Sequence, residues 1–112
     1  MSISKDNLLH ILKEKIYESI YPLKMGGKIN KESFDALVSL AEEATRIFKK
    51  EAMVPKELLS EIYLSSMGIY CENLHFESED LSCYSERMME CFNFIIDGKS
   101  VDEKKESEPI IV

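Results

Sequence analysis

The first residues of this chain that could do chemistry together are Cys71, His75 and Cys83, three possible metal ligands. Cys71 and His75 are four residues apart near the end of an expected helix, so their side chains share one face. A structural zinc site needs four ligands, usually in Cys-x-x-Cys pairs, and the sequence contains no such pair. Cys91 lies about 12 Å along a helix from Cys83, too far to share a metal ion with it. We therefore predict no metal site and interpret the cysteines as reduced, small apolar side chains.

The second candidate is the segment His10-Ile11-Leu12-Lys13, which has the order His-x-Leu-Lys. It resembles the motif of histidine-containing phosphotransfer domains, which are acidic four-helix bundles of about this size. The resemblance implies that an exposed His10 accepts phosphate and that Lys13 offsets its charge. A Gly follows the Lys in that family, whereas this chain has Glu14, and a second anion beside a phosphohistidine is unfavourable. A phosphotransfer-like signalling role is therefore the alternative and not the first interpretation.

Other reaction chemistry has little support in the sequence. Gly26-Gly27-Lys28 is too short for a phosphate-binding loop and lacks the Ser or Thr that follows the Lys. No Ser or Cys has both a nearby base and a group to orient that base. No carboxylate lies on an apolar helix face, where burial would tune its pKa. We predict a protein that is not an enzyme and needs no cofactor.

The apolar pattern that would position these residues is helical throughout. It predicts an all-α fold, an antiparallel four-helix bundle with helices at about 5–20, 31–50, 55–75 and 79–97. Ser4, Asn30 and Ser78 are expected N-caps, and Gly98 suits the position after the last helix. Tyr21-Pro22 is expected to end the first helix, because the residue before a proline disfavours the α conformation.

The domain organisation expected from this pattern is a single helical domain. A helical domain over 1–98 is followed by a polar tail over 99–112, which ends in the apolar Pro109-Ile110-Ile111-Val112. The role of that ending is open. No apolar run approaches the roughly 18 residues that span a membrane, and no signal peptide is evident, so we expect a cytoplasmic protein.

Charge is distributed unevenly along the 112 residues, whose net charge is −7. Residues 1–52 carry 9 basic and 8 acidic side chains, whereas residues 53–112 carry 5 and 13. Nucleic acids and anionic membranes both require clustered Lys and Arg, so neither is an expected partner. A basic protein is the expected partner.

On helical wheels, acids align on the outer faces of the last two expected helices. One stripe contains Glu79, Glu86 and Glu90, and the other runs from Glu57 through Gly68 to Glu72. Because these helices are joined by a short turn, we expect the two stripes to form one joint acidic surface. The predicted partner-binding residues are Glu57, Glu61, Leu64, Gly68, Glu72, Glu79, Asp80, Glu86 and Glu90.

Size, acidity, the all-α pattern and the absence of a secretion signal together resemble the small immunity proteins of bacterial contact-dependent toxin systems. The resemblance rests on these general properties, since no motif defines the group. It implies a cytoplasmic inhibitor that covers the basic active site of a nuclease-type toxin domain, with its acids imitating phosphates. A dimerising adaptor in signalling is the remaining alternative, and the oligomeric state is open.

Overall fold

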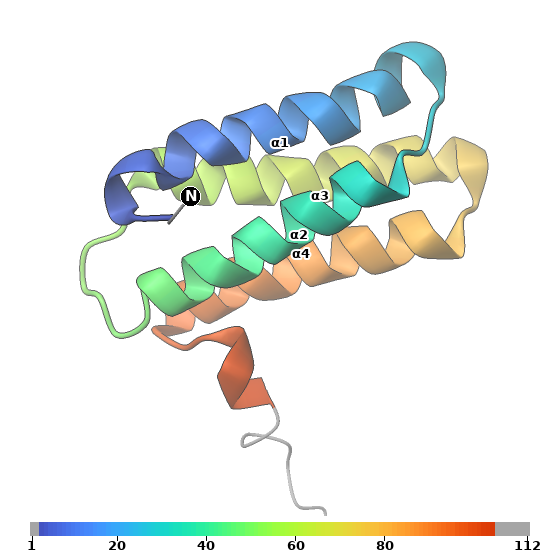
Figure 1. The fold of residues 1–112 in the computed structure, drawn as a ribbon. Coiled ribbons are helices and arrows are strands. Elements are labelled where there is room, and N and C mark those ends of the chain that lie inside the picture. Colours follow the sequence, from blue (N-terminus) through green and yellow to red (C-terminus); the bar gives the residue numbers. More distant parts are fainter. Residues whose placement is uncertain (1–2, 105–112) are drawn as a thin grey trace, which may run out of the picture.

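The computed structural model describes residues 3–104 and contains four α-helices: α1 Lys5–Gly26, α2 Lys31–Ile47, α3 Lys56–Phe76 and α4 Glu79–Asp97. A short 3-10 helix, η1 Val101–Lys104, follows them (Figure 1). The described residues contain no strand, which confirms the predicted all-α bundle. In the same part of the chain, none of the helices has the length and apolarity needed to cross a membrane.

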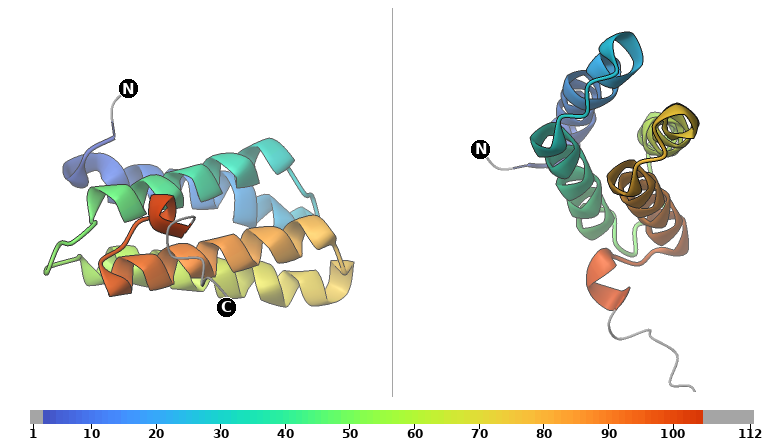
Figure 2. Two further views of the ribbon diagram at one scale, coloured as in Figure 1. Left: turned by 90° about the horizontal axis from the view of Figure 1, so that it is seen from below. Right: turned by 90° about the vertical axis from the view of Figure 1, so that its right-hand side faces the viewer.

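The helices form two hairpins, α1–α2 and α3–α4, which pack against each other (Figure 2). Each hairpin is antiparallel, as predicted. Between the hairpins α2 lies against α4 and α1 lies against α3, and the helices of each of these pairs run in the same direction. The ion pair between Lys31 and Asp80, at 2.9 Å, accordingly joins the starts of α2 and α4. Segment 48–55 therefore connects two helices at opposite corners of the bundle.

One hydrophobic core fills the space between the two hairpins. All four helices contribute to it, and the ring of Phe34 stacks on the ring of Tyr84 with centroids 5.1 Å apart. Each fully buried apolar side chain contributes about 1.5–3 kcal/mol to stability. The largest fully buried apolar side chains are Leu8, Leu12, Leu23, Phe34, Leu37, Leu58, Ile62, Ile69, Leu81 and Met88.

Two serines join the helices of the second hairpin by reciprocal hydrogen bonds. The Ser66 hydroxyl donates to the Ser85 carbonyl oxygen at 2.7 Å, and the Ser85 hydroxyl donates to the Ser66 carbonyl oxygen at 2.9 Å. Both residues are buried, and both hydroxyls are satisfied, so neither carries the cost of an unpaired buried polar group. Small side chains at these positions let α3 and α4 approach closely.

The end of α1 corrects the sequence prediction, because the helix continues through Pro22 to Gly26 and does not end at residue 20. Two interactions outweigh the local preference against α structure before a proline. Leu23 is fully buried in the core, and Gly27 adopts the left-handed conformation with φ 64°. Its N–H donates to the Leu23 carbonyl oxygen at 3.0 Å, which closes the last turn as a glycine cap.

The end of α2 also differs from the prediction, since this helix stops at Ile47 and not at residue 50. Lys50 has a positive φ of 62°, which a continuing helix cannot contain. Its N–H donates to the Gly98 carbonyl oxygen at 3.1 Å, which ties the end of α2 to the end of α4. The helix observed at 56–76 is one residue displaced from the prediction, and the helix at 79–97 has the predicted bounds.

The predicted caps are found where the sequence placed them. Asn30 and Ser78 each accept a hydrogen bond from the backbone N–H three residues later, at 3.3 Å. Ser4 occupies the N-cap of α1, and its N–H donates to the Asn7 side chain at 2.7 Å. Gly98 caps α4 with φ 73°. Helix starts were therefore readable from single polar residues.

The chain after Gly98 is partly structured, although the sequence suggested a tail from residue 99. Ser100 is buried, and η1 packs against α2. The folded part therefore extends beyond residue 98. The apolar Pro109–Val112 lies outside the described residues.

Candidate functional site

The acidic stripe of α4 lies on the outside of the bundle, as expected. Glu79, Glu86 and Asp97 are exposed and Glu90 is half-buried. Asp80, at the start of the same helix, is exposed and paired with Lys31 of α2. The carboxylates of α4 therefore face solvent, and Glu86 lies between the α2 side of the helix and a hollow beside Met67 and Tyr70 of α3.

The acids of α3 lie on a different side of the molecule, so the expected joint acidic surface is not formed. The Glu57 carboxylate pairs with Lys13 of α1, and Glu61 lies close enough to raise the pKa of Lys13 further, after the Glu57 hydrogen bond. A Cβ on Gly68 would lie 3.7 Å from the Lys24 side chain, also on α1. Glu72 is half-buried. The expected stripe on α3 therefore borders α1 and is separated from the stripe on α4.

The reason for this displacement is that α3 is apolar on more than one side. The large apolar side chains of Tyr63, Tyr70 and Leu74 are exposed, whereas the small Ser65 is buried. Two neighbouring helices pack on the small residues of α3, where close approach is possible. Larger apolar side chains are thereby left on the outside of the helix.

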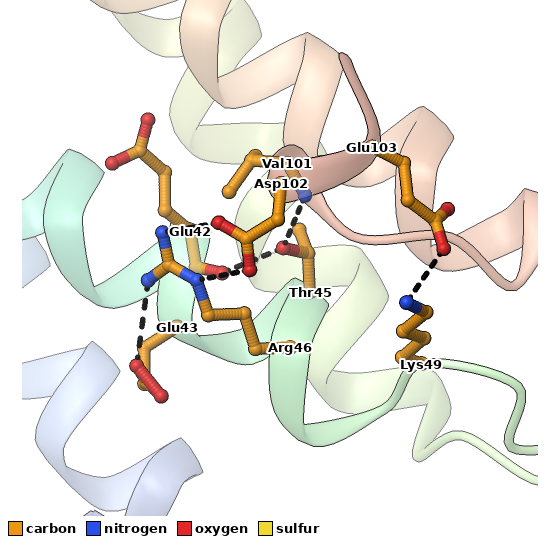
Figure 3. Close-up of polar contacts among 8 residues, drawn as sticks. All are labelled: Glu42, Glu43, Thr45, Arg46, Lys49, Val101, Asp102 and Glu103. Carbon is orange, nitrogen blue, oxygen red and sulfur yellow. Dashed lines mark hydrogen bonds and ion pairs between the residues drawn. The ribbon is translucent and has the colours of Figure 1, made fainter. Parts of the chain in front are cut away.

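A groove beside the acidic stripe begins where η1 is held on α2 (Figure 3). Arg46 donates to both carboxylate oxygens of Asp102, at 3.0 and 3.3 Å, and this hydrogen bonding raises the pKa of Arg46. Val101 N–H donates to the Thr45 hydroxyl at 3.1 Å. A further ion pair, at 2.7 Å, joins Lys49 to Glu103 (Figure 3). These contacts fix η1 as one wall of the groove.

The groove itself lies between α2, α4 and η1 and has a volume of about 560 Å³. Arg87 donates to Glu42 at 2.9 Å, so the charges of Arg46 and Arg87 are both already matched by acids. With Glu86 and Glu90, the lining contains four carboxylates and two arginines, so its net charge is negative. Its lining residues are Glu42, Arg46, Cys83, Glu86, Arg87, Glu90, Cys91, Phe94, Val101 and Asp102. Such a groove attracts a cationic group.

The residues considered for metal or phosphate chemistry lie apart from one another. Cys71 and His75 are exposed on α3, whereas Cys83 lines the groove on the α2 side of α4. In the described part of the chain, no three His, Cys, Asp or Glu side chains form a cluster suited to a metal ion. His10 is exposed on α1, and its Nε2 lies 3.7 Å from Glu14 Oε1. Phosphate on His10 would therefore face a carboxylate directly.

Burial makes one of the two thiols that line the groove, that of Cys91, unreactive. Cys91 lies in the core between α2 and α4, and burial raises its pKa to about 12. The thiol is therefore protonated near neutral pH, and the thiolate is the form that acts as a nucleophile or metal ligand. Cys91 therefore contributes a packed side chain to the groove and no reactive group.

A second exposed surface, which sequence reasoning missed, is the apolar outer side of α3. Tyr63, Leu64, Met67, Tyr70 and Leu74 are all exposed, with Leu64 58% and Leu74 65% accessible. The signal that could have revealed it is the absence of charge. No residue from 62 to 71 is charged, on a helix that has a solvent-facing side.

The fold is an all-α bundle of two packed hairpins. Comparisons with known proteins do not assign the chain to a narrower class. Comparison of the chain with protein-family models, with curated proteins and with solved structures finds no match. The function is therefore argued from the two surfaces described above.

Proposed function

We propose that this chain is a non-catalytic binding protein that covers a basic surface on a protein partner. The resemblance to immunity proteins makes a nuclease-type toxin domain in the cytoplasm the preferred partner. The observation that carries the proposal is the surplus of carboxylates on α4 and its groove, where both arginines are already paired. A nucleic-acid or anionic-membrane partner would be repelled by the same surface.

The proposed binding site is narrower than the one expected from the sequence. It consists of Glu79, Glu86 and Glu90 of α4, together with the groove that Glu42 and Asp102 border. The acids of α3 are left out, because Glu57 pairs with Lys13 of α1 and Glu61 lies close enough to act on the same lysine. A Lys or Arg side chain of the partner fits the groove by charge.

A non-catalytic role is supported by the state of the possible reactive groups. Cys91 is buried with a raised pKa, and the hydroxyls of Ser66 and Ser85 are bonded to backbone carbonyls. A phosphotransfer role at His10 is disfavoured by the adjacent Glu14.

The test uses an inactivated form of the basic toxin domain encoded by the neighbouring gene. We expect a stoichiometric complex whose association slows strongly between low and physiological salt, since electrostatic attraction acts mainly on the association rate. The double substitution Glu86→Lys and Glu90→Lys should weaken binding at least a hundredfold, because like charges then meet.

The matched control is the double substitution Glu14→Lys and Glu18→Lys on α1, which makes the same change of net charge away from the groove. Circular dichroism checks that both variants remain folded. Equal loss of binding in the two variants would refute the site. A neighbouring gene that encodes no toxin, with no binding to any basic nuclease domain, would refute the function.

A further inference from the structure

We propose that the outer side of α3 is the contact surface for a second copy of this chain, which docks with its own α3 in the antiparallel direction. The proposal is independent of the proposed function, because it uses residues outside the acidic groove. In the end-on view of Figure 2, α3 lies at a corner of the bundle, and no described helix covers its outer side.

The spacing of the outward residues is that of a helix–helix seam. Ser60, Leu64, Met67, Cys71 and Leu74 recur at alternating intervals of four and three residues, and all five are exposed. This is the heptad spacing with which one helix packs its side chains between those of another. Met67 borders α4 at a hollow that Ser85 and Met89 also line, and Leu64 and Leu74 remain more than half exposed, so most of the seam faces solvent in the single copy.

The residues that flank the seam favour an antiparallel partner. Lys56, Tyr63, Tyr70 and Glu77 are spaced by seven residues along one edge of it, and each is exposed. When two identical helices pack antiparallel, these flanking positions meet in reverse order. Lys56 then faces Glu77 of the second copy, and Tyr63 faces Tyr70 of the second copy.

This pairing also explains charges that are unfavourable in a single copy. Lys56 stands at the positive end of the α3 macrodipole and Glu77 stands just beyond its negative end, each opposite to the helical preference. An antiparallel second copy brings an opposite charge to both residues and sets the two macrodipoles against each other. Charge complementarity therefore selects a second copy in this orientation.

Electrostatics favours this part of the surface for such a contact. Two chains of net charge −7 repel each other, and a two-fold contact brings the same surface of both copies together. Residues 62–71 form a charge-free stretch of α3, and Glu86 of α4 lies at its edge beside Met67 and Tyr70. The uncharged stretch of α3 is thus also the part of the helix that exposes large apolar side chains.

The size of the contact fits a dimer of modest affinity. With about 200 Å² for each whole side chain, the exposed parts of the five large apolar residues amount to roughly 500 Å² per copy. The flanking Lys56, Ser60, Cys71 and Glu77 bring this toward the roughly 800 Å² per partner of stable interfaces. We expect a dissociation constant on the order of micromolar.

The first test measures the molar mass of the full chain by analytical ultracentrifugation across a range of concentrations. We expect a monomer–dimer equilibrium that Met67→Glu, or Leu64→Glu as a second variant, weakens at least about a hundredfold. Met53→Glu is the control, because Met53 is 84% exposed and lies off α3. A chain that stays monomeric, or a dimer that tolerates the α3 variants, would overturn the proposal.

The second test addresses orientation by charge exchange. Lys56→Glu should weaken the dimer about tenfold or more, and the double variant Lys56→Glu with Glu77→Lys should restore it, since the opposite charges then meet again. Failure of the double variant to restore dimerisation would overturn the antiparallel pairing. The single variant Glu90→Lys, in the groove and not at the hollow beside Met67 and Tyr70, should leave the dimer unchanged, so failure here is separate from failure of the proposed function.

Discussion

We expect the burial of Leu23 to stabilise the last turn of α1. Replacing Leu23 by Ala therefore tests why the helix continues past Pro22. Leu23 is 1% exposed, so the change removes three buried carbons. At about 0.8 kcal/mol per methylene the transfer loss is about 2.4 kcal/mol, and the remaining cavity adds to it. Leu23 lies near the end of the bundle, where neighbours can relax, so we expect about 2.5–3.5 kcal/mol.

The assay for this loss is urea unfolding followed by circular dichroism. With a slope of roughly 1.5 kcal/mol per molar urea, the midpoint should fall by about 2 M. Met25→Ala is the control, since Met25 belongs to the same turn but is 71% exposed, and its loss should be below about 0.5 kcal/mol. Equal, small effects of both variants would refute the claim that burial of Leu23 extends the helix.

Three further outcomes follow from buried and paired groups. Cys91 should resist a thiol reagent until the protein unfolds, because its pKa is raised to about 12, while the two exposed cysteines react at once in a colorimetric thiol assay. Thr45→Val should cost about 1–2 kcal/mol and speed amide hydrogen exchange at Val101, whose N–H loses its acceptor. The hydrogen bond from Lys49 lowers the pKa of Glu103 below 4.5, so this ion pair stabilises η1 fully above that pH and is lost as the pH falls below it. Exchange in η1 measured against pH should show that loss, and an unchanged rate in acid would contradict it.

The helices were predictable because the signals that begin and end them are local. Asn30 and Ser78 cap their helices through a bond to a backbone group three residues away, and Gly98 ends α4 by its own left-handed conformation. Pro22 is the exception. Its local preference was read correctly, but burial of Leu23 and the cap at Gly27 decide the outcome, and both depend on the folded bundle.

Of the two candidate surfaces, the acidic one on α4 could be predicted from the sequence, whereas the apolar one on α3 could not. The reason is that the two helices distribute their apolar residues differently. On α4 the acids alternate with a clear apolar side, so the outward direction of Glu86 follows from the wheel. On α3 large apolar residues occur on several sides, and a helical wheel alone does not show which of these sides the neighbouring helices cover. The small Gly68 lies beside Lys24 of α1, and this contact between helices is not contained in any single-helix pattern.

Segment 48–55 crosses the bundle diagonally and joins the two hairpins. Because all three cysteines are free, no disulfide adds a second covalent link between the hairpins. Residues 49–53 of this link are exposed, so a protease can reach it. Each half would keep a complete antiparallel helix pair and one side of the shared core. The ion pair between Arg46 of α2 and Asp102 of η1 would still join the two halves. The chain is therefore suited to fragment complementation, in which two separately produced pieces, 1–50 and 51–112, reassemble into one folded protein.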